Sequence, residues 1–440
     1  MVIAKRLGMM YLWIDCLCII QDSQEDWQEQ SASMGQVFFN SYCNIAAAHA
    51  ADGTQGCFTD RNPALVTPLK LQLDWGPNPG AYYSVEWLFW RMNVLETPLN
   101  RRAWVCQERY LAPRNLYFGA TQLYWECCEL AACEGFPVQL PQRLGTSMPK
   151  GIIPHIDGAR IRRASDMGDD VTLNVFSVWD RIVSMYTSGA LTYAADKLVA
   201  LSGMAFKVHE HTGCEYLAGL WRKHLAYQLL WQVRRLQWNV PRMRPLQYIA
   251  PSWSWASVTG RIEDACQIRF ADDREIIIEI LDAGVELDSR NPFGQVKSGF
   301  LRIRGSLAKD PVYLEERRTN RGSYRFLIDC VRAGEALVDI DTQTEDLAVH
   351  RDLYYLPIRH RKSRSTTCLS GEHFAIPEIS GIILQSTCTD RLYEFARFGR
   401  FDIFGTTNGF KRACQQFGGQ VNINDSQDSE WGTQQTITLV

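Results

Sequence analysis

The sequence predicts an α/β region at the N-terminus, followed by a helical segment and a β-rich C-terminal region. Three observations support this order. A strand–helix–strand pattern fills the first 50 residues, which is typical of a parallel sheet covered by helices. Apolar residues then recur at helical spacing between residues 173 and 260. Short apolar runs with strand composition continue from there to residue 404.

Within the α/β region, Tyr11–Ile20 (YLWIDCLCII) is an apolar run that predicts a buried strand. Ser23 with Asp26 three residues later is a capping-box pattern, so a helix is expected to begin there. Residues 42–48 predict a second buried strand. The apolar face of the helix is expected to hold Trp27, Met34, Val37 and Phe38.

Later elements follow from similar signals. Asn100 is expected to cap a helix that runs to Leu111, and residues 115–118 and 122–127 predict two strands joined by a turn. Three helices are expected in the helical segment, with apolar faces at 175–186, 198–208 and 217–229. Strands are expected at 275–280, 300–305, 354–358 and 381–385.

Breaks in these patterns divide the chain into five segments. Scattered proline, glycine and arginine mark a linker, and a Gln-, Asn-, Gly- and Ser-rich composition predicts a loosely ordered tail. The segments are 1–136, the α/β domain; 137–172, the linker; 173–260, the helical region; 261–404, the β-rich region; and 405–440, the polar tail.

Composition and charge exclude several classes of protein. The 440 residues carry 46 Lys and Arg against 49 Asp and Glu, and the net charge of −3 argues against a strongly basic nucleic-acid binder. No apolar run reaches the ~18 residues that a membrane span needs. The apolar run at residues 7–14 imitates a signal peptide, but Asp15 ends it without a cleavage site. We therefore expect a cytoplasmic protein, no nucleic-acid or membrane partner, and 14 cysteines that are mostly reduced and packed.

Several motifs occur in a fixed order along the chain. They are Tyr11–Asp22, Asp26-Trp27, Met34, Arg102–Tyr110 (RAWVCQERY) and Tyr124–Cys127, followed by Asp196–Gly203, Tyr216–Trp221 and Ala250–Trp255. Together they resemble the fungal heterokaryon-incompatibility (HET) domain and the segments that follow it in HET proteins. The resemblance covers about two thirds of the chain.

The resemblance implies a cytoplasmic protein of fungal non-self recognition, in which HET domains trigger growth arrest and cell death. It implies other incompatibility or signalling proteins as partners, and self-association. HET domains are also distantly similar to TIR domains, some of which hydrolyse NAD with a glutamate on a helix. The resemblance therefore implies a TIR-like, Rossmann-like α/β fold for the first domain, with NAD as a candidate substrate and no firm cofactor.

Two departures from the HET pattern bear on this expectation. The family has an opening strand with an S-Y-x-W-G-type motif, whereas this chain begins about ten residues before Tyr11. We therefore expect an incomplete, N-terminally truncated HET domain. The family's DW-x-x-E pattern would place a glutamate where Gln30 stands, and Glu29 lies one position earlier. One position turns a side chain by ~100° around a helix, so Glu29 does not simply replace that glutamate.

Glu108 and Glu29 are the two candidate catalytic carboxylates. Trp104 and Glu108 are four residues apart on one helix face, next to Gln107 of the same motif, so an indole could stack on a base while the carboxylate binds a hydroxyl. A carboxylate would also steady the positive charge that develops at a ribose during hydrolysis. The alternative is that Glu108 pairs with Arg101 or Arg102 and Trp104 belongs to the core.

Asp15, Asp22, Asp26 and Trp27 are further pocket candidates. Asp15 interrupts an apolar run, where a buried carboxylate requires hydrogen bonds. Asp22 and Asp26 follow the predicted strand and would line a crevice at its carboxyl end. The structural alternative makes Asp22 part of a turn and Asp26 a capping residue, and it is favoured.

The cysteine clusters do not have the spacing of a zinc site. Cys128 and Cys133 approximate only half of one, Cys16 and Cys18 lack partners, and no histidine is near. We expect no metal site.

Three hypotheses for function remain: contact-mediated cell-death signalling, NAD(P) hydrolysis of the TIR type, and an inactive truncated paralogue. The missing motif and Gln30 favour the first and third over the second.

Overall fold

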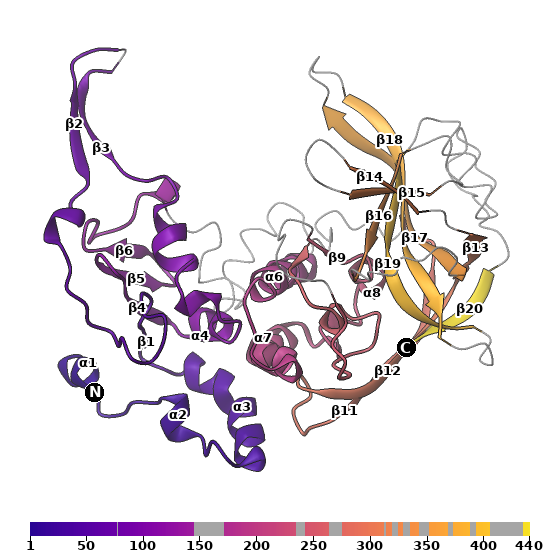
Figure 1. The fold of residues 1–440 in the computed structure, drawn as a ribbon, viewed down its shortest axis with the longest axis horizontal. Coiled ribbons are helices and arrows are strands. Elements are labelled where there is room, and N and C mark those ends of the chain that lie inside the picture. The colour runs from indigo at the N-terminus through magenta and orange to yellow at the C-terminus, as the bar shows by residue number, and fades with distance from the viewer. Residues whose placement is uncertain are drawn as a thin grey trace.

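Figure 1 shows the computed structural model of the chain, in which an N-terminal α/β part, a helical middle and a β-rich C-terminal part follow one another. The predicted mixed α/β class with a β-rich C-terminal region is confirmed at this level. None of the helices in the described residues combines the length and the apolar character needed to cross a bilayer. The structure describes residues 1–76, 78–144, 171–234, 243–263, 275–311, 314–318, 324–328, 335–342, 352–367, 373–387, 393–404 and 434–440.

The strand predicted at residues 11–20 is wrong. This segment contains a short helix, α2 (Asp15–Cys18), with extended residues on both sides. Tyr11 is 88% and Leu17 is 71% exposed, so the apolar run does not enter a sheet. Asp15 Oδ1 accepts a hydrogen bond from the N–H of Cys16 at 2.8 Å. Short aspartate side chains that bond to nearby backbone groups favour such turns, and an apolar run alone does not distinguish a turn from a strand.

The first long helix is confirmed. α3 (Gln24–Phe39) begins after Ser23, whose hydroxyl accepts a hydrogen bond from the N–H of Asp26 at 3.2 Å. Met34 and Phe38 are buried on its inner face, as the spacing predicts, and Trp27 is half-buried. The cap supplies one partner for the free N–H groups of the first turn.

A four-stranded sheet follows, with strand order β1-β4-β5-β6. β1 (Asn44–Ala46) confirms the second predicted strand and pairs in parallel with β4 (Arg114–Phe118). The next two strands, β5 (Leu123–Cys127) and β6 (Ala131–Cys133), pair antiparallel. The sheet is therefore mixed and not the parallel sheet that the strand–helix–strand pattern predicts. The TIR-like or Rossmann-like identity of the region is not established by this arrangement.

The helix predicted from Asn100 begins later. α4 covers Val105–Leu111, and the Asn100 side chain donates to the carbonyl of Val94 at 2.7 Å instead of capping it. The remaining elements of this part are α1 (Val2–Arg6), the 3₁₀ turns η1 (Pro63–Leu65), η3 (Leu99–Arg101) and η4 (Gln142–Leu144), the hairpin strands β2 (Leu69–Leu73) and β3 (Gly80–Ser84), and the π-helical turn η2 (Arg91–Leu95).

The helical middle contains two of the three expected helices, α6 (Val171–Tyr186) and α7 (Ser202–Thr212). The third expected helix, at 217–229, is wrong. Its first half is a hairpin, because Ala218 and Gly219 adopt positive φ angles (47° and 101°) that a helix does not accommodate. The other elements here are η6 (Ala194–Lys197), η7 (Val199–Leu201), β7 (Tyr216–Leu217), β8 (Leu220–Trp221), α8 (Leu225–Gln228), β9 (Gln232–Val233), η8 (Trp255–Ser257) and β10 (Ile262–Glu263).

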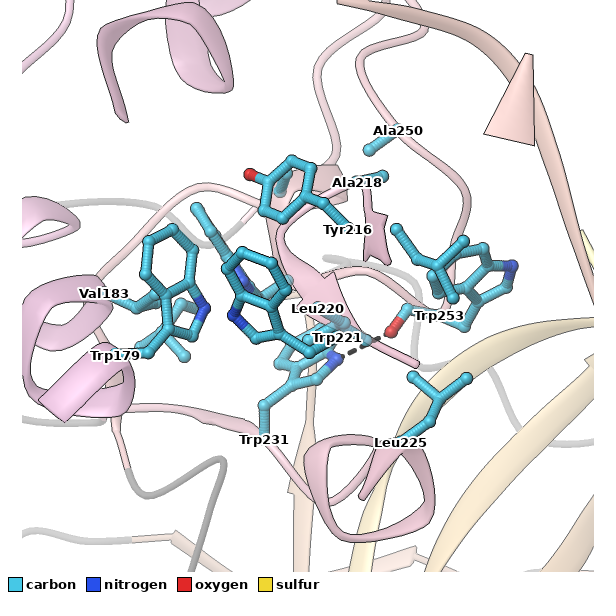
Figure 2. Close-up of a cluster of buried hydrophobic side chains, with 14 of the residues drawn as sticks. Trp179, Val183, Tyr216, Ala218, Leu220, Trp221, Leu225, Trp231, Ala250 and Trp253 are labelled. Atoms are coloured by element: carbon cyan, nitrogen blue, oxygen red, sulfur yellow. Dashed lines mark hydrogen bonds between the residues drawn. The ribbon is translucent and has the colours of Figure 1, made fainter. Parts of the chain in front are cut away.

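Buried tryptophans form the centre of this middle part (Figure 2). Trp221, Trp231 and Trp253 are 0% exposed, and Trp231 Nε1 donates to the carbonyl of Trp253 at 2.8 Å. Trp179 and Trp221 pack edge to face with ring centroids 5.4 Å apart. These rings come from α6, the β7–β8 hairpin, the residues between α8 and β9, and the loop before η8, so the core joins four segments of the chain.

The C-terminal part is an eight-stranded sheet with the order β11-β12-β20-β19-β18-β17-β13, in which β16 also pairs with β19. The prediction of a loosely ordered tail is wrong for residues 434–439, which form β20 between β12 and β19; residues 405–433 lie outside the described residues. The strands are β11 (Glu279–Leu287), β12 (Val296–Ser306), β13 (Ala308–Pro311), β16 (Glu335–Ile340), β17 (Asp352–Thr367), β18 (His373–Ser386), β19 (Glu394–Phe404) and β20 (Gln434–Leu439), with a separate hairpin β14 (Leu314–Arg318) and β15 (Tyr324–Ile328).

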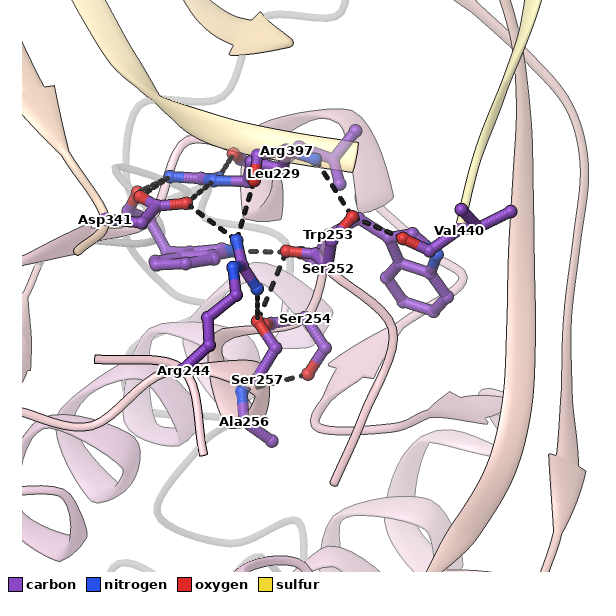
Figure 3. Close-up of polar contacts among 11 residues, drawn as sticks. Leu229, Arg244, Ser252, Trp253, Ser254, Ala256, Ser257, Asp341, Arg397 and Val440 are labelled. Atoms are coloured by element: carbon purple, nitrogen blue, oxygen red, sulfur yellow. Dashed lines mark hydrogen bonds and ion pairs between the residues drawn. The ribbon is translucent and has the colours of Figure 1, made fainter. Parts of the chain in front are cut away.

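A buried arginine connects this sheet to the helical middle (Figure 3). Arg397 of β19 forms an ion pair with Asp341 (2.9 Å) and donates to the carbonyls of Leu229 and Trp231. Its guanidinium also lies 3.5 Å from the centroid of the Trp231 ring. The charge is therefore both paired and hydrogen-bonded, which a buried arginine requires.

Candidate functional site

The residues around α2 and α3 are held by local hydrogen bonds. Asp26 Oδ2 accepts from the N–H of Ile20 at 2.7 Å, and Gln30 Nε2 lies 3.5 Å from Asp26 Oδ1. Asp26 therefore stabilises the turn between α2 and α3. Asp22 is exposed in that turn, and Asp15 is exposed at the start of α2. The structure thus gives these three carboxylates positions in and beside a turn.

The tryptophans of the motifs connect segments of the chain. Trp13 packs edge to face on Phe38 of α3, with ring centroids 5.6 Å apart. Trp104 precedes α4, and its Nε1 lies 3.3 Å from Asp196 Oδ2. This contact joins the RAWVCQERY motif to the Asp196–Gly203 motif. Trp104 therefore has a hydrogen-bonding partner within the fold.

Gln107 lies where α3, α4 and α7 meet. It is 0% exposed, and its Nε2 lies 3.8 Å from the sulfur of Met34. Among the described residues its Oε1 has no hydrogen-bond partner. Gly35 and Gly203 allow the helices to approach closely, since a Cβ added to Gly203 would lie 2.7 Å from the Cα of Gly35. Met34, Gln107 and Gly203, which come from three different motifs, therefore pack together at this junction.

Glu108 is half-buried on α4. Burial raises the pKa of its carboxyl to about 7, the positive charge of Arg102 opposes the rise, and the negative charge of Asp15 adds to it. Glu108 therefore exchanges its proton near neutral pH, which suits a group that acts as an acid or a base. Asp15 and Glu108, which are far apart in the sequence, are brought into electrostatic contact by the fold.

Glu29 lies elsewhere, on the exposed side of α3. It lines a cleft of about 1200 Å³ between α3, α7 and the turn that connects β11 to β12. The side chains of this cleft include Glu25, Phe206, Lys207, Arg290 and Phe293. Glu108 is not among the lining residues, so the two candidate catalytic carboxylates do not share this cleft.

A buried ion pair was not anticipated from the sequence. Arg109 of α4 contacts Glu126 of β5 through two hydrogen bonds of 2.9 and 2.6 Å, and the hydroxyl of Tyr117 donates to the same carboxylate at 2.8 Å. Arg109 belongs to the RAWVCQERY motif and Glu126 to the Tyr124–Cys127 motif. The opposite charges of Arg109 and Glu126 within the two motifs are the signal that could have revealed this pair.

The cysteines offer thiols but no metal centre in the described part of the chain. No group of three or more His, Cys, Asp or Glu side chains there could hold a metal ion. None of the nine described cysteines forms a disulfide. Cys16 and Cys18 lie exposed on α2 and not in the buried strand predicted at residues 11–20.

Exposed apolar side chains gather in the N-terminal part. Most of the large exposed hydrophobic residues in the described part of the chain precede residue 93. Trp75 is 75% and Trp87 is 77% exposed, beside the β2–β3 hairpin, while Met10 and Tyr11 exceed 80% before α2. Where such side chains form a contiguous patch, they mark an interaction surface.

Comparison with known proteins distinguishes this N-terminal part from the rest. Residues 1–108 match the family model described as Heterokaryon incompatibility protein (HET). The resemblance seen in the motifs is confirmed for these residues. The HET match ends at Glu108 and includes α1, α2, α3, β1 and the β2–β3 hairpin. No curated protein and no solved structure matches the chain.

Proposed function

We propose that this protein acts in heterokaryon-incompatibility-type non-self recognition, as a cytoplasmic cell-death signalling module that works through protein contacts. One observation carries the proposal: the residues that match the HET family are also those with most of the exposed large apolar side chains. Burying this surface against a partner would remove apolar area from water, which is the main driving force of association.

The experiment compares two surfaces of similar chemistry. Tyr11, Leu17 and Ile20 in the HET-matching part are changed together to serine, and Met243, Leu246 and Tyr248 outside it are changed together as the matched control. All six are exposed, at 88, 71, 59, 50, 109 and 48% respectively, so neither set is expected to unfold the chain. Each variant is expressed in a fungal host, growth is measured, and circular dichroism confirms folding.

We expect the wild type and the control to arrest growth and the Tyr11 set to lose that effect. Equal arrest by both variants would contradict a role for the N-terminal apolar surface. If the wild type neither arrests growth nor acts on NAD, the hypothesis of an inactive paralogue is favoured instead.

NAD(P) hydrolysis is the second candidate function, and Glu108 supports it. Its carboxyl pKa of about 7 leaves a substantial anionic fraction at neutral pH, and that form can stabilise an oxocarbenium-like charge. The test is nicotinamide release from NAD by the purified chain, with Glu108→Gln and Glu29→Gln as the two variants. Loss in Glu108→Gln alone would support this function, and absence of release by a wild type that arrests growth would exclude it.

A further inference from the structure

The β2–β3 hairpin extends away from the body of the molecule, at the upper left of Figure 1. It forms a sheet of only two strands, separate from the four-stranded sheet of the same part. A two-stranded hairpin in water is at best marginally stable, because it has too few neighbours to cover its backbone and side chains. Each strand also presents an outer edge of unpaired N–H and C=O groups.

One face of the hairpin is apolar. Side chains alternate along a strand, so Leu69, Leu71 and Leu73 share a face. The register places Tyr82 opposite Leu71, on this same face. Leu69 is 64%, Leu71 40% and Tyr82 41% exposed. The opposite face carries Lys70 and Gln72 of β2 with Tyr83 and Ala81 of β3, all of them exposed.

The edge of β2 is complementary to itself. If two copies pair antiparallel about Leu71, each Leu69 lies opposite the other copy's Leu73, and the two Leu71 residues lie opposite each other. On the other face Lys70 lies opposite Gln72, so no like charges meet. A two-fold axis produces this arrangement with identical surfaces on both copies, as closed dimers require.

We propose that the β2 edges of two copies of this chain pair antiparallel about Leu71, which joins the two hairpins into one four-stranded sheet. The new ladder pairs the outward-facing backbone groups of β2 and places three leucines of each copy side by side. β3 offers a poorer edge, because its residues on the same face are Gly80, Tyr82 and Ser84. This inference rests on the proposed contact-mediated function and names a second copy as one partner.

Cysteine cross-linking tests the register. Single variants are made at residues 70, 71 and 72 of the full chain, with the exposed Cys16 and Cys18 changed to serine. Leu71→Cys is expected to give a covalent dimer under mild oxidation, because residue 71 faces itself. Lys70→Cys and Gln72→Cys are matched controls: each alone is expected to stay uncross-linked, whereas a mixture of the two is expected to form the cross-link. A dimer with Tyr82→Cys but not with Leu71→Cys would overturn the β2 edge in favour of β3.

Solution mass tests the interface without cross-linking. Wild type is expected to show a concentration-dependent dimer by light scattering. Leu71→Lys would place two positive charges directly opposite each other, so this variant is expected to be monomeric. Lys70→Glu is the control: the new carboxylate lies opposite the neutral Gln72 of the other copy, so this variant is expected to dimerise like wild type. A wild type that is monomeric throughout, or a Leu71→Lys variant that dimerises unchanged, overturns the inference. If Leu71→Lys is monomeric and still arrests growth, the proposed signalling function stands without this dimer.

Discussion

The HET-matching N-terminal part and the helical middle differ in how much of their tryptophan surface is buried. Trp75 and Trp87 of the first are mostly exposed, whereas Trp221, Trp231 and Trp253 of the second are fully buried. A small core around Trp90 and Tyr124 lies against the four-stranded sheet, while the large core extends from α3 and α4 through the helical middle into the C-terminal sheet. The comparison indicates that the second region holds more of the buried aromatic side chains and that the first exposes more apolar surface.

The largest expected effect tests this division with one residue from each region. Trp221→Ala should lower the free energy of unfolding by about 3–5 kcal/mol, because it removes a large side chain from a closely packed core. Trp75→Ala, at 75% exposure, should change it by less than about 0.5 kcal/mol. Urea denaturation followed by circular dichroism measures both. Equal losses would contradict the comparison.

Arg397 provides the next test, at the joint between the helical middle and the C-terminal sheet. Arg397→Leu should cost about 3–5 kcal/mol, because it removes the closer of the two arginines that pair with the buried carboxylate of Asp341 and the donor to the carbonyls of Leu229 and Trp231. Arg304→Ala removes an exposed pair with Glu279 and should cost about 0–1 kcal/mol. The same denaturation measurement applies. If Arg397→Leu unfolds at the wild-type urea concentration, the buried pair does not hold the two parts together.

Gly203→Ala tests how closely the N-terminal part packs against the helical middle. The added Cβ would meet the backbone of Gly35 at 2.7 Å, so α3 and α7 must separate, at a cost of about 1–3 kcal/mol. Gly53→Ala is the control, because nothing lies within 4 Å of a Cβ added there. Thermal unfolding of the two variants should therefore differ. A wild-type melting temperature for Gly203→Ala would indicate that the helices pack less closely.

The smallest expected effect is a pH dependence at Glu108. Burial raises the pKa of this carboxyl from 4.5 to about 7, so between these values the folded chain holds more protons than the unfolded chain. Its contribution to stability therefore falls as the pH rises from 4.5 to 7 and stays constant above that. Glu108→Gln should match wild type near pH 4 and be more stable by about 1–2 kcal/mol above pH 7. Urea midpoints across this range measure it, with Glu29→Gln as control, and parallel profiles for wild type and Glu108→Gln would contradict it.

Elements with strong local signals could be predicted from the sequence. The cap at Ser23 and the apolar spacing of Met34 and Phe38 located α3, and the helical period located α6. The elements that were not predicted either lacked such signals or lay in a segment whose polar composition suggested a loosely ordered chain. β20 alternates Thr436, Ile437, Thr438 and Leu439, a strand pattern inside a polar segment, and its pairing with β12 depends on residues about 130 positions away.

The candidate site was predicted less well than the fold. Glu29 and Glu108 stand in neighbouring motifs, but the structure places them in different surroundings, one in the cleft and one beside Arg102. Sequence spacing fixes the face of a helix and does not fix what that face meets. The pairing of Arg109 with Glu126 and the approach of Asp15 to Glu108 are examples, since each joins different elements.

The sequence alone determined the HET resemblance, the mixed α/β class and the β-rich C-terminal region, because motifs and periodicity are local properties of the chain. Only the tertiary structure decided which apolar residues are buried. Tyr11 and Trp221 both stand in the motifs from which the HET resemblance was predicted, yet one is 88% exposed and the other 0%. Burial depends on whether another segment packs over a side chain, and that is set by contacts between residues far apart in the sequence.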